Sequence, residues 1–277
     1  MSNLIPDYIP RFGWLRPGSP LGRARLGLLA ALTVLTGAAW ALTVYQALSM
    51  NAPMEGMSDM AMSGMPAAGW SFASAGVFLG VWTVMMAAMM LPATAPMILV
   101  FVSAQAQHER PTAVPTWTFV AGYLLVWLVA GAVVYVLGQV GSNLATLITP
   151  TDLVSWKPIA LGATLVAAGL YQFTPLKRVC LSHCRSPLAF VAQHWRDGRL
   201  GALQMGISHG TYCLGCCWAL FAVLVAAGLM SLAWMLLLTL VVFVEKVVPQ
   251  GQRISTAIGI AFVGLGIMVA TGLVANP

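Results

Sequence analysis

The chain contains seven apolar stretches, each close to the length needed to cross a lipid bilayer, and this pattern limits its fold more than any other feature. They lie at about 26–49, 73–103, 117–140, 158–174, 203–228, 231–248 and 254–275. A helix of about 20 residues crosses a hydrocarbon core of about 30 Å. Inside lipid every backbone polar group needs an internal partner, and these runs do not alternate as barrel strands do. We therefore predict an all-α, polytopic transmembrane helix bundle of about seven spans, with six as the alternative count.

The composition supports the same class. Of the 277 residues 60% are hydrophobic and only 7% are charged, whereas soluble domains carry about 25% charged residues. So few charges could not cover the surface of a soluble domain of this size. We expect an N-terminal segment at 1–25, which is cytoplasmic, and a single transmembrane domain at 26–275 with a Met-rich extracytoplasmic loop at 50–69. The first apolar run is too long for a cleaved signal peptide and is interpreted as a retained span.

Basic residues predict the orientation. With seven spans, twelve of the thirteen Lys and Arg fall on one side, and Lys157 alone falls on the other. Loops rich in Lys and Arg stay cytoplasmic. The sequence therefore predicts a multi-pass protein of the bacterial cytoplasmic membrane with its N-terminus in the cytoplasm. The net charge of +6 is explained by basic residues that face anionic lipid, not by a nucleic-acid partner.

The loop after the first predicted span is rich in methionine. Six methionines lie within sixteen residues, at Met50, Met54, Met57, Met60, Met62 and Met65. Thioethers are soft, neutral donors that select Cu(I) over harder ions. The loop is predicted to capture Cu(I), and the alternative is a disordered loop with a chance excess of methionine.

A second methionine group lies inside the second predicted span. Met85, Met86, Met89 and Met90 are spaced so that i,i+4 pairs share one broad helix face. We expect Met86, Met89 and Met90 to bind metal, although methionine is also an ordinary packing residue. Pro92 and Pro96 follow and should free backbone carbonyls.

The five cysteines fall into two clusters that also contain two histidines. The candidate ligands are Cys180, His183 and Cys184 in the first cluster, and His209, Cys213, Cys216 and Cys217 in the second. Thiolates and imidazoles at helical spacing suit Cu(I), with zinc or iron as alternatives. A single site requires segment 176–187 to fold back beside the fifth span, or that span to begin later. The alternative is that these cysteines pack as small hydrophobic residues, which suits Cys217 best.

Glu245 and Lys246 stand near the end of the sixth predicted span. One interpretation is an interfacial ion pair that reaches water. The other is that Glu245 points into the bundle as a metal ligand, a proton acceptor or the partner of an arginine, because buried charges in membranes tend to be functional.

Several motifs together resemble a known family. They are Trp82…Met86…Ala88-Met89-Met90-Leu91-Pro92, Gly122-Tyr123, Tyr171-Gln172…Pro175-Leu176-Lys177…Cys180…Cys184-Arg185, Cys213-Leu214-Gly215-Cys216-Cys217-Trp218 and Glu245-Lys246…Pro249. Over roughly residues 75 to 270 the chain resembles the predicted metal-binding integral membrane proteins (DUF2182), a family of unknown function. The resemblance implies a membrane protein with a metal site and implies no particular reaction.

The function favoured by these observations is Cu(I) handling or delivery. Copper would bind the outer loop, pass along Met85–Met90 to the Cys/His clusters, and leave to a copper chaperone or a cuproenzyme. No P-loop is found, and exchange between soft ligands needs no energy source. The alternatives are a membrane oxidoreductase, including one that uses Cys213 and Cys216 as a thiol couple, an accessory subunit of a metal-dependent membrane oxygenase, and a structural subunit stapled by a metal. A function other than catalysis is favoured.

Overall fold

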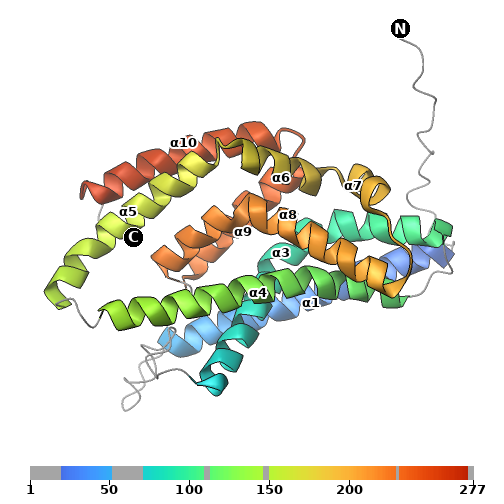
Figure 1. Cartoon of the computed structure of the whole chain (residues 1–277), viewed down its shortest axis with the longest axis horizontal. Coiled ribbons are helices and arrows are strands. Elements are labelled where there is room, and N and C mark those ends of the chain that lie inside the picture. The colour runs from blue at the N-terminus through green and yellow to red at the C-terminus, as the bar shows by residue number, and fades with distance from the viewer. Residues whose placement is uncertain (1–19, 52–70, 109–112, 146–149, 229–230, 274–277) are drawn as a thin grey trace, which may run out of the picture.

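The chain forms a bundle of long helices, seen in a computed structural model (Figure 1). The structure describes residues 20–51, 71–108, 113–145, 150–228 and 231–273. The helices are α1 (Pro20–Asn51), α3 (Phe72–His108), α4 (Ala113–Ala145), α5 (Pro150–Tyr171), α6 (Pro175–Arg185), α7 (Pro187–His194), α8 (Gly198–Ala227), α9 (Leu232–Val247) and α10 (Gly251–Ala270). These ranges contain no strand, and the predicted all-α class is confirmed.

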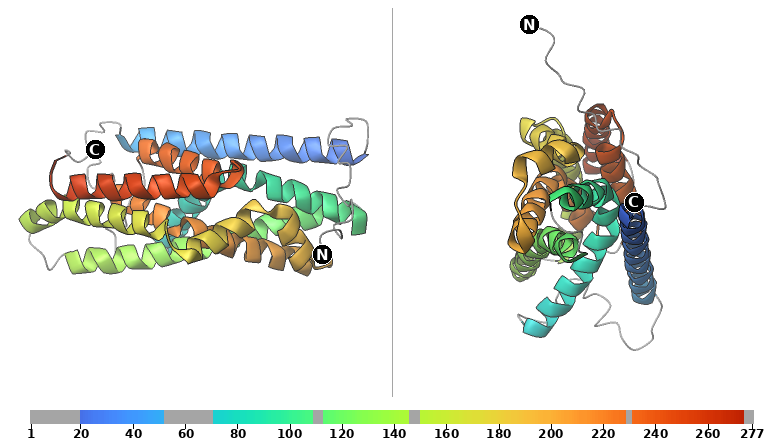
Figure 2. Two further views of the ribbon diagram at one scale, coloured as in Figure 1. Left: turned by 90° about the horizontal axis from the view of Figure 1, so that it is seen from above. Right: turned by 90° about the vertical axis from the view of Figure 1, so that its right-hand side faces the viewer.

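Within the described residues, the number of candidate spans agrees with the alternative count of six and not with seven. Five helices are long and apolar enough to cross a membrane, or six if the bent pair α5–α6 forms one span. The missing span corresponds to α9, which has only 16 residues and is shorter than the ~20 needed. The predicted break before it is confirmed, because α8 ends at Ala227 and Gly228 adopts a φ of 108°. Large apolar side chains such as Val34 and Leu137 point outward, as helices in contact with lipid require. Figure 2 shows most of the long helices running along one common direction, with the first half of α3 oblique to them.

Helix α3 passes through the middle of the bundle and contains both predicted prolines. Its ribbon changes direction between its first and second halves (Figure 1). Pro92 has no N–H to donate to Ala88, four residues earlier. The free carbonyl of Ala88 accepts a hydrogen bond from the Trp40 indole at 3.0 Å. The proline therefore creates an acceptor that ties α1 to α3.

Two helix pairs pack with their backbones almost in contact, through glycines. In the α4–α8 pair, a Cβ on Gly122 would lie 2.5 Å from the carbonyl oxygen of Leu203. In the α5–α10 pair, a Cβ on Gly162 would lie 2.7 Å from the carbonyl oxygen of Gly266. Small residues allow such close approach in membrane bundles, where van der Waals packing drives helix association.

A sharp bend between α5 and α6 places α6 beside α8. The axes of α5 and α6 meet at 67°. Thr174 is the N-cap of α6, because its side chain accepts a hydrogen bond from the Lys177 backbone amide. Pro175 occupies the first turn of the same helix. Helix α6 then packs along α8. Segment 176–187 therefore takes the first of the two routes that a single cysteine site required.

Candidate metal centre

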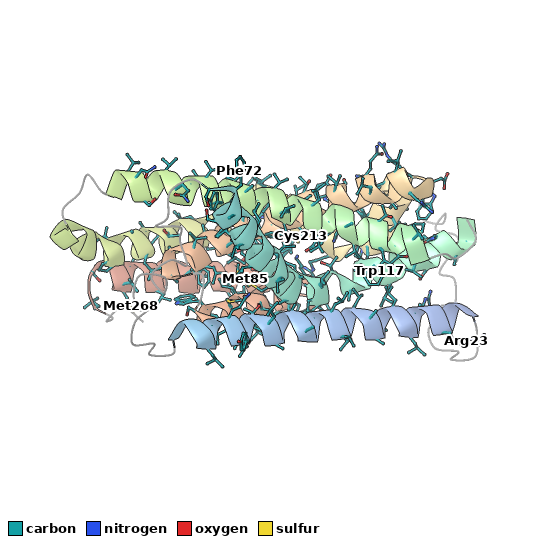
Figure 3. All side chains as sticks on the ribbon, turned by 90° about the horizontal axis from the view of Figure 1, so that it is seen from below. Arg23, Phe72, Met85, Trp117, Cys213 and Met268 are labelled. Carbon is teal, nitrogen blue, oxygen red and sulfur yellow. The ribbon has the colours of Figure 1, made fainter. Side chains whose placement is uncertain are left out.

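Four of the five cysteines meet where α6 lies against α8. We call Cys184, Cys213, Cys216 and Cys217 the thiol cluster. The Sγ of Cys184 on α6 lies 3.9 Å from the Sγ of Cys216 on α8. Cys213 interacts with the thiols of the other three. The three cysteines of α8 are at most 1% exposed, and Figure 3 shows Cys213 in the interior, about halfway along the bundle.

The spacing between Cys184 and Cys216 suits a shared thiophilic ion. With a metal–sulfur bond of about 2.3 Å, two sulfurs on a trigonal ion stand about 4.0 Å apart. The observed 3.9 Å matches that separation, whereas the 3.2 Å between Cys216 and Cys217 is too short for it. Within the described residues, no three His, Cys, Asp or Glu side chains are grouped so that they could hold a metal ion. The pair at 3.9 Å offers two sulfur donors, and sulfur is a soft ligand of the kind that Cu(I) favours.

Two predicted ligands on α6 face elsewhere. The Sγ of Cys180 packs against Gly215, where an added Cβ would lie 2.7 Å from the sulfur. The ring of His183 stacks on Tyr212 with centroids 4.2 Å apart, and its Nδ1 lies 2.9 Å from the Val179 carbonyl oxygen. Helix α6 thus contributes one side chain, Cys184, to the thiol cluster, and ligand roles for Cys180 and His183 remain predictions.

His209 lies one helical turn before Cys213 in an aromatic environment. Its ring centroid is 5.3 Å from that of Phe190 and 5.8 Å from that of Tyr123. The side chain is buried, and its Nδ1 has no hydrogen-bond partner. Burial without a partner costs free energy, so His209 keeps a ring nitrogen that a ligand or a water could use.

The methionines of α3 are buried in the same core as the thiol cluster. Met86, Met89 and Met90 have no exposed surface. They belong to the same buried core as Cys213 and Cys216, and Figure 3 shows the neighbouring Met85 in the interior. The six methionines of the loop, from Met50 to Met65, lie outside the described residues. Sulfur atoms of two chemical kinds therefore share one core.

Two residues that contact Cys213, Lys246 and Tyr123, were not predicted from the sequence to belong to the site. The Lys246 ammonium donates a hydrogen bond to the Cys213 Sγ at 2.9 Å, and the Tyr123 hydroxyl lies 3.0 Å from the same sulfur. Lys246 was assigned to the cytoplasmic loop charges, yet it is buried. A lysine that directly follows an acidic residue in an apolar helix was the available signal.

Glu245 forms a buried ion pair instead of an interfacial one. Its Oε2 lies 2.8 Å from the Lys177 Nζ, and both side chains are at most 2% exposed. The expectation of a pair that reaches water is therefore wrong, and the partner is a lysine instead of an arginine. Lys177 and Lys246 no longer count as loop charges. Glu245 Oε1 is buried without a hydrogen-bond partner, and a role for Glu245 as metal ligand remains a prediction.

Fold and site together define a class: helical proteins with spans apolar enough for a membrane and a buried cluster of sulfur donors. Within that class, the model of a copper chaperone family, PpoB2, matches residues 79–269. The match covers more than half of the chain, and the chain belongs to this family. The matched segment nearly coincides with residues 75 to 270, over which the motifs resemble DUF2182. The description of the matched family names copper, whereas DUF2182 is a family of unknown function. Searches of curated proteins and of solved structures found no match.

Proposed function

We propose that this protein is a membrane-embedded copper chaperone that receives Cu(I) at its Met-rich loop and holds it in the thiol cluster. The observation that carries the proposal is the single buried core shared by Met86, Met89, Cys213 and Cys216. Thioethers and thiolates both favour Cu(I). An ion could therefore exchange one sulfur ligand for the next without being released into an apolar interior.

The ligand types give the transfer a direction. Thioethers bind as neutral donors, whereas a cysteine must lose its proton to bind a metal. The anionic thiolate then attracts a cation more strongly than the neutral thioether does. Copper would therefore move from the loop through the α3 methionines to the thiol cluster. From there it would pass to a copper chaperone or a cuproenzyme on the cytoplasmic side.

The alternative functions place different demands on the cysteines. A thiol–disulfide oxidoreductase needs an accessible thiolate, and the near-complete burial of Cys213 and Cys216 counts against it. A stapling metal between Cys184 and Cys216 would join α6 to α8 and would be retained permanently. An accessory subunit of an oxygenase would bind zinc or iron at the same donors.

The test measures metal in the purified full-length chain. Wild-type protein, a deletion of residues 50–65, Cys216→Ser and the matched control Cys180→Ser are loaded with Cu(I) under reducing conditions. Metal per chain is then determined by mass spectrometry, and unfolding is followed by circular dichroism.

We expect Cys216→Ser to lose copper while it keeps its helical content, and Cys180→Ser to bind as wild type does. The deletion should slow copper loading and leave the final occupancy unchanged. A stapling role predicts that Cys216→Ser loses thermal stability together with metal. Zinc or iron at full occupancy, with copper absent after loading, would overturn the proposal.

A further inference from the structure

One face of α8 continues from the thiol cluster toward an end of the bundle as a row of buried donor side chains. His209 lies one turn before Cys213, and Met205 lies one turn before His209. We call these three residues the donor row. All three are at most 2% exposed. At about 1.5 Å per residue, successive members are about 6 Å apart along the helix axis, and the row runs toward the end that the basic residues predict to be cytoplasmic.

The donor row ends in a pocket at the surface of the protein. The pocket has a volume of about 190 Å³ and is lined by His194, Arg196, Gln204, Met205 and Ser208. Arg196 and Gln204 are exposed, whereas Met205 is buried. The pocket therefore joins the buried row to the surface. Figure 1 shows α7, which ends at His194, at the same end of the bundle as the start of α8.

Aromatic rings hold His209 between the thiol cluster and the pocket. On one side, the ring centroid of Tyr123 lies 5.8 Å from that of His209, and the Tyr123 hydroxyl lies 3.0 Å from the Cys213 Sγ. On the other side, the ring centroid of Phe190 lies 5.3 Å from that of His209. The same Phe190 ring stacks on His194 of the pocket with centroids 4.5 Å apart. One packed group of rings thus connects the two histidines.

Both histidines have a ring nitrogen to offer a metal. The Nδ1 of His209 is buried and has no hydrogen-bond partner among the described residues, an arrangement that costs free energy. The Nδ1 of His194 lies 3.2 Å from the Phe190 carbonyl oxygen. Because a carbonyl only accepts, a neutral His194 ring donates from Nδ1 and has its lone pair on Nε2. Imidazole nitrogens and thioethers are both ligands that suit copper.

We infer that copper leaves the thiol cluster along the donor row, through His209 and Met205, and reaches its acceptor at His194 in the surface pocket. The inference rests on the proposed function, since it adds an exit to the same site. Each step exchanges one ligand for the next and leaves the ion as Cu(I). As the ion departs, a proton returns to the cysteine, which reverses the loading step. The neutral donors bind Cu(I) less tightly than a thiolate does, so release requires an acceptor that empties the pocket.

The test follows the release of copper from the purified full-length chain after loading with Cu(I). Bathocuproine disulfonate, a water-soluble chelator that forms a coloured Cu(I) complex, is added in excess, and absorbance is recorded over time. His209→Phe, Met205→Leu and His194→Phe each remove one donor and keep an apolar or aromatic side chain. Met235→Leu is the matched control, because Met235 is also buried but lies on α9, outside the donor row.

Two further measurements keep the result decisive. Helical content and copper per chain are determined for every variant, and Met205→Leu serves alone if His209→Phe does not fold. Each variant is also tested with residues 50–65 deleted, which removes the outer loop as a second way out.

We expect the rate of release to fall by at least about tenfold in His209→Phe and in Met205→Leu, because the ion must cross a wider apolar gap. Copper per chain should not change. His194→Phe should slow release less, since the pocket is open to the surface, and Met235→Leu should match the wild type. Wild-type release rates in folded variants that hold copper would overturn the inference and leave the proposed function intact. Failure of the wild type to bind Cu(I) would overturn both.

Discussion

Two buried lysines in neighbouring parts of the molecule have different kinds of partner. Lys177, on α6, forms an ion pair with the carboxylate of Glu245 at 2.8 Å. Lys246, on α9, faces the sulfur of Cys213 at 2.9 Å. Both ammonium groups lose their water on burial, but an ordinary carboxyl group is ionised at neutral pH, whereas an ordinary thiol is mostly protonated there. The first pair stabilises the junction of α6 and α9, and the second leaves a sulfur poised to bind a competing cation.

The largest loss of stability is expected when the ion pair between Lys177 and Glu245 is broken. Glu245→Gln leaves the Lys177 ammonium buried without a counter-charge, and loss of one partner of a buried pair costs about 3–5 kcal/mol. Denaturant unfolding in detergent should show this loss. The double variant Lys177→Met/Glu245→Gln should recover much of it. A fully stable single variant would contradict a structural role for the pair.

A smaller loss of stability is expected at the second lysine. Cys213→Ser replaces the ionisable thiol with a hydroxyl that can still accept a hydrogen bond, while Cys216 and Cys217 remain near Lys246. We expect a cost of about 1–3 kcal/mol, as for a weakened hydrogen bond to a charged group, together with a clear fall in bound copper. Cys180→Ser serves as the control, and equal copper binding by the two variants would argue against the thiol cluster.

The smallest loss of stability is expected at Tyr123, which contacts the same Cys213 sulfur as Lys246. Tyr123→Phe removes the hydroxyl near the Cys213 sulfur and keeps the ring, which also packs near His209. A net cost of about 1 kcal/mol is expected for one hydrogen bond, measured by denaturant unfolding. The copper content should stay close to the wild-type value, because the substitution removes no sulfur. A large loss of bound copper would mean that the hydroxyl is needed to hold the Cys213 sulfur in place.

The helical class, the break at Gly228 and the burial of the α3 methionines could be read from the sequence. They depend on local patterns: run length, turn residues and i,i+4 spacing. The number of spans could be read from the sequence only as six or seven, because hydropathy does not reveal that α9 has 16 residues and that its end, with Glu245 and Lys246, lies among other helices.

The members of the site could be predicted only in part. All four cysteines of the thiol cluster were candidates, because their spacing along each helix is visible. The sequence does not reveal whether Cys180 or Cys184 faces the thiols of α8. That choice depends on the 67° bend before α6 and on the close contact of Cys180 with Gly215. Lys246 and Tyr123 were missed because their roles arise from contacts between distant segments.

X-ray absorption at the copper edge of the Cu(I)-loaded protein tests the central claim most directly, because it reports the atoms bound to the ion. We expect a shell of two or three sulfur atoms that loses one sulfur in Cys184→Ser and one in Cys216→Ser, and that is unchanged in Cys180→Ser. A shell dominated by nitrogen or oxygen, or one that neither substitution alters, would contradict the claim that thiols from α6 and α8 hold one copper ion.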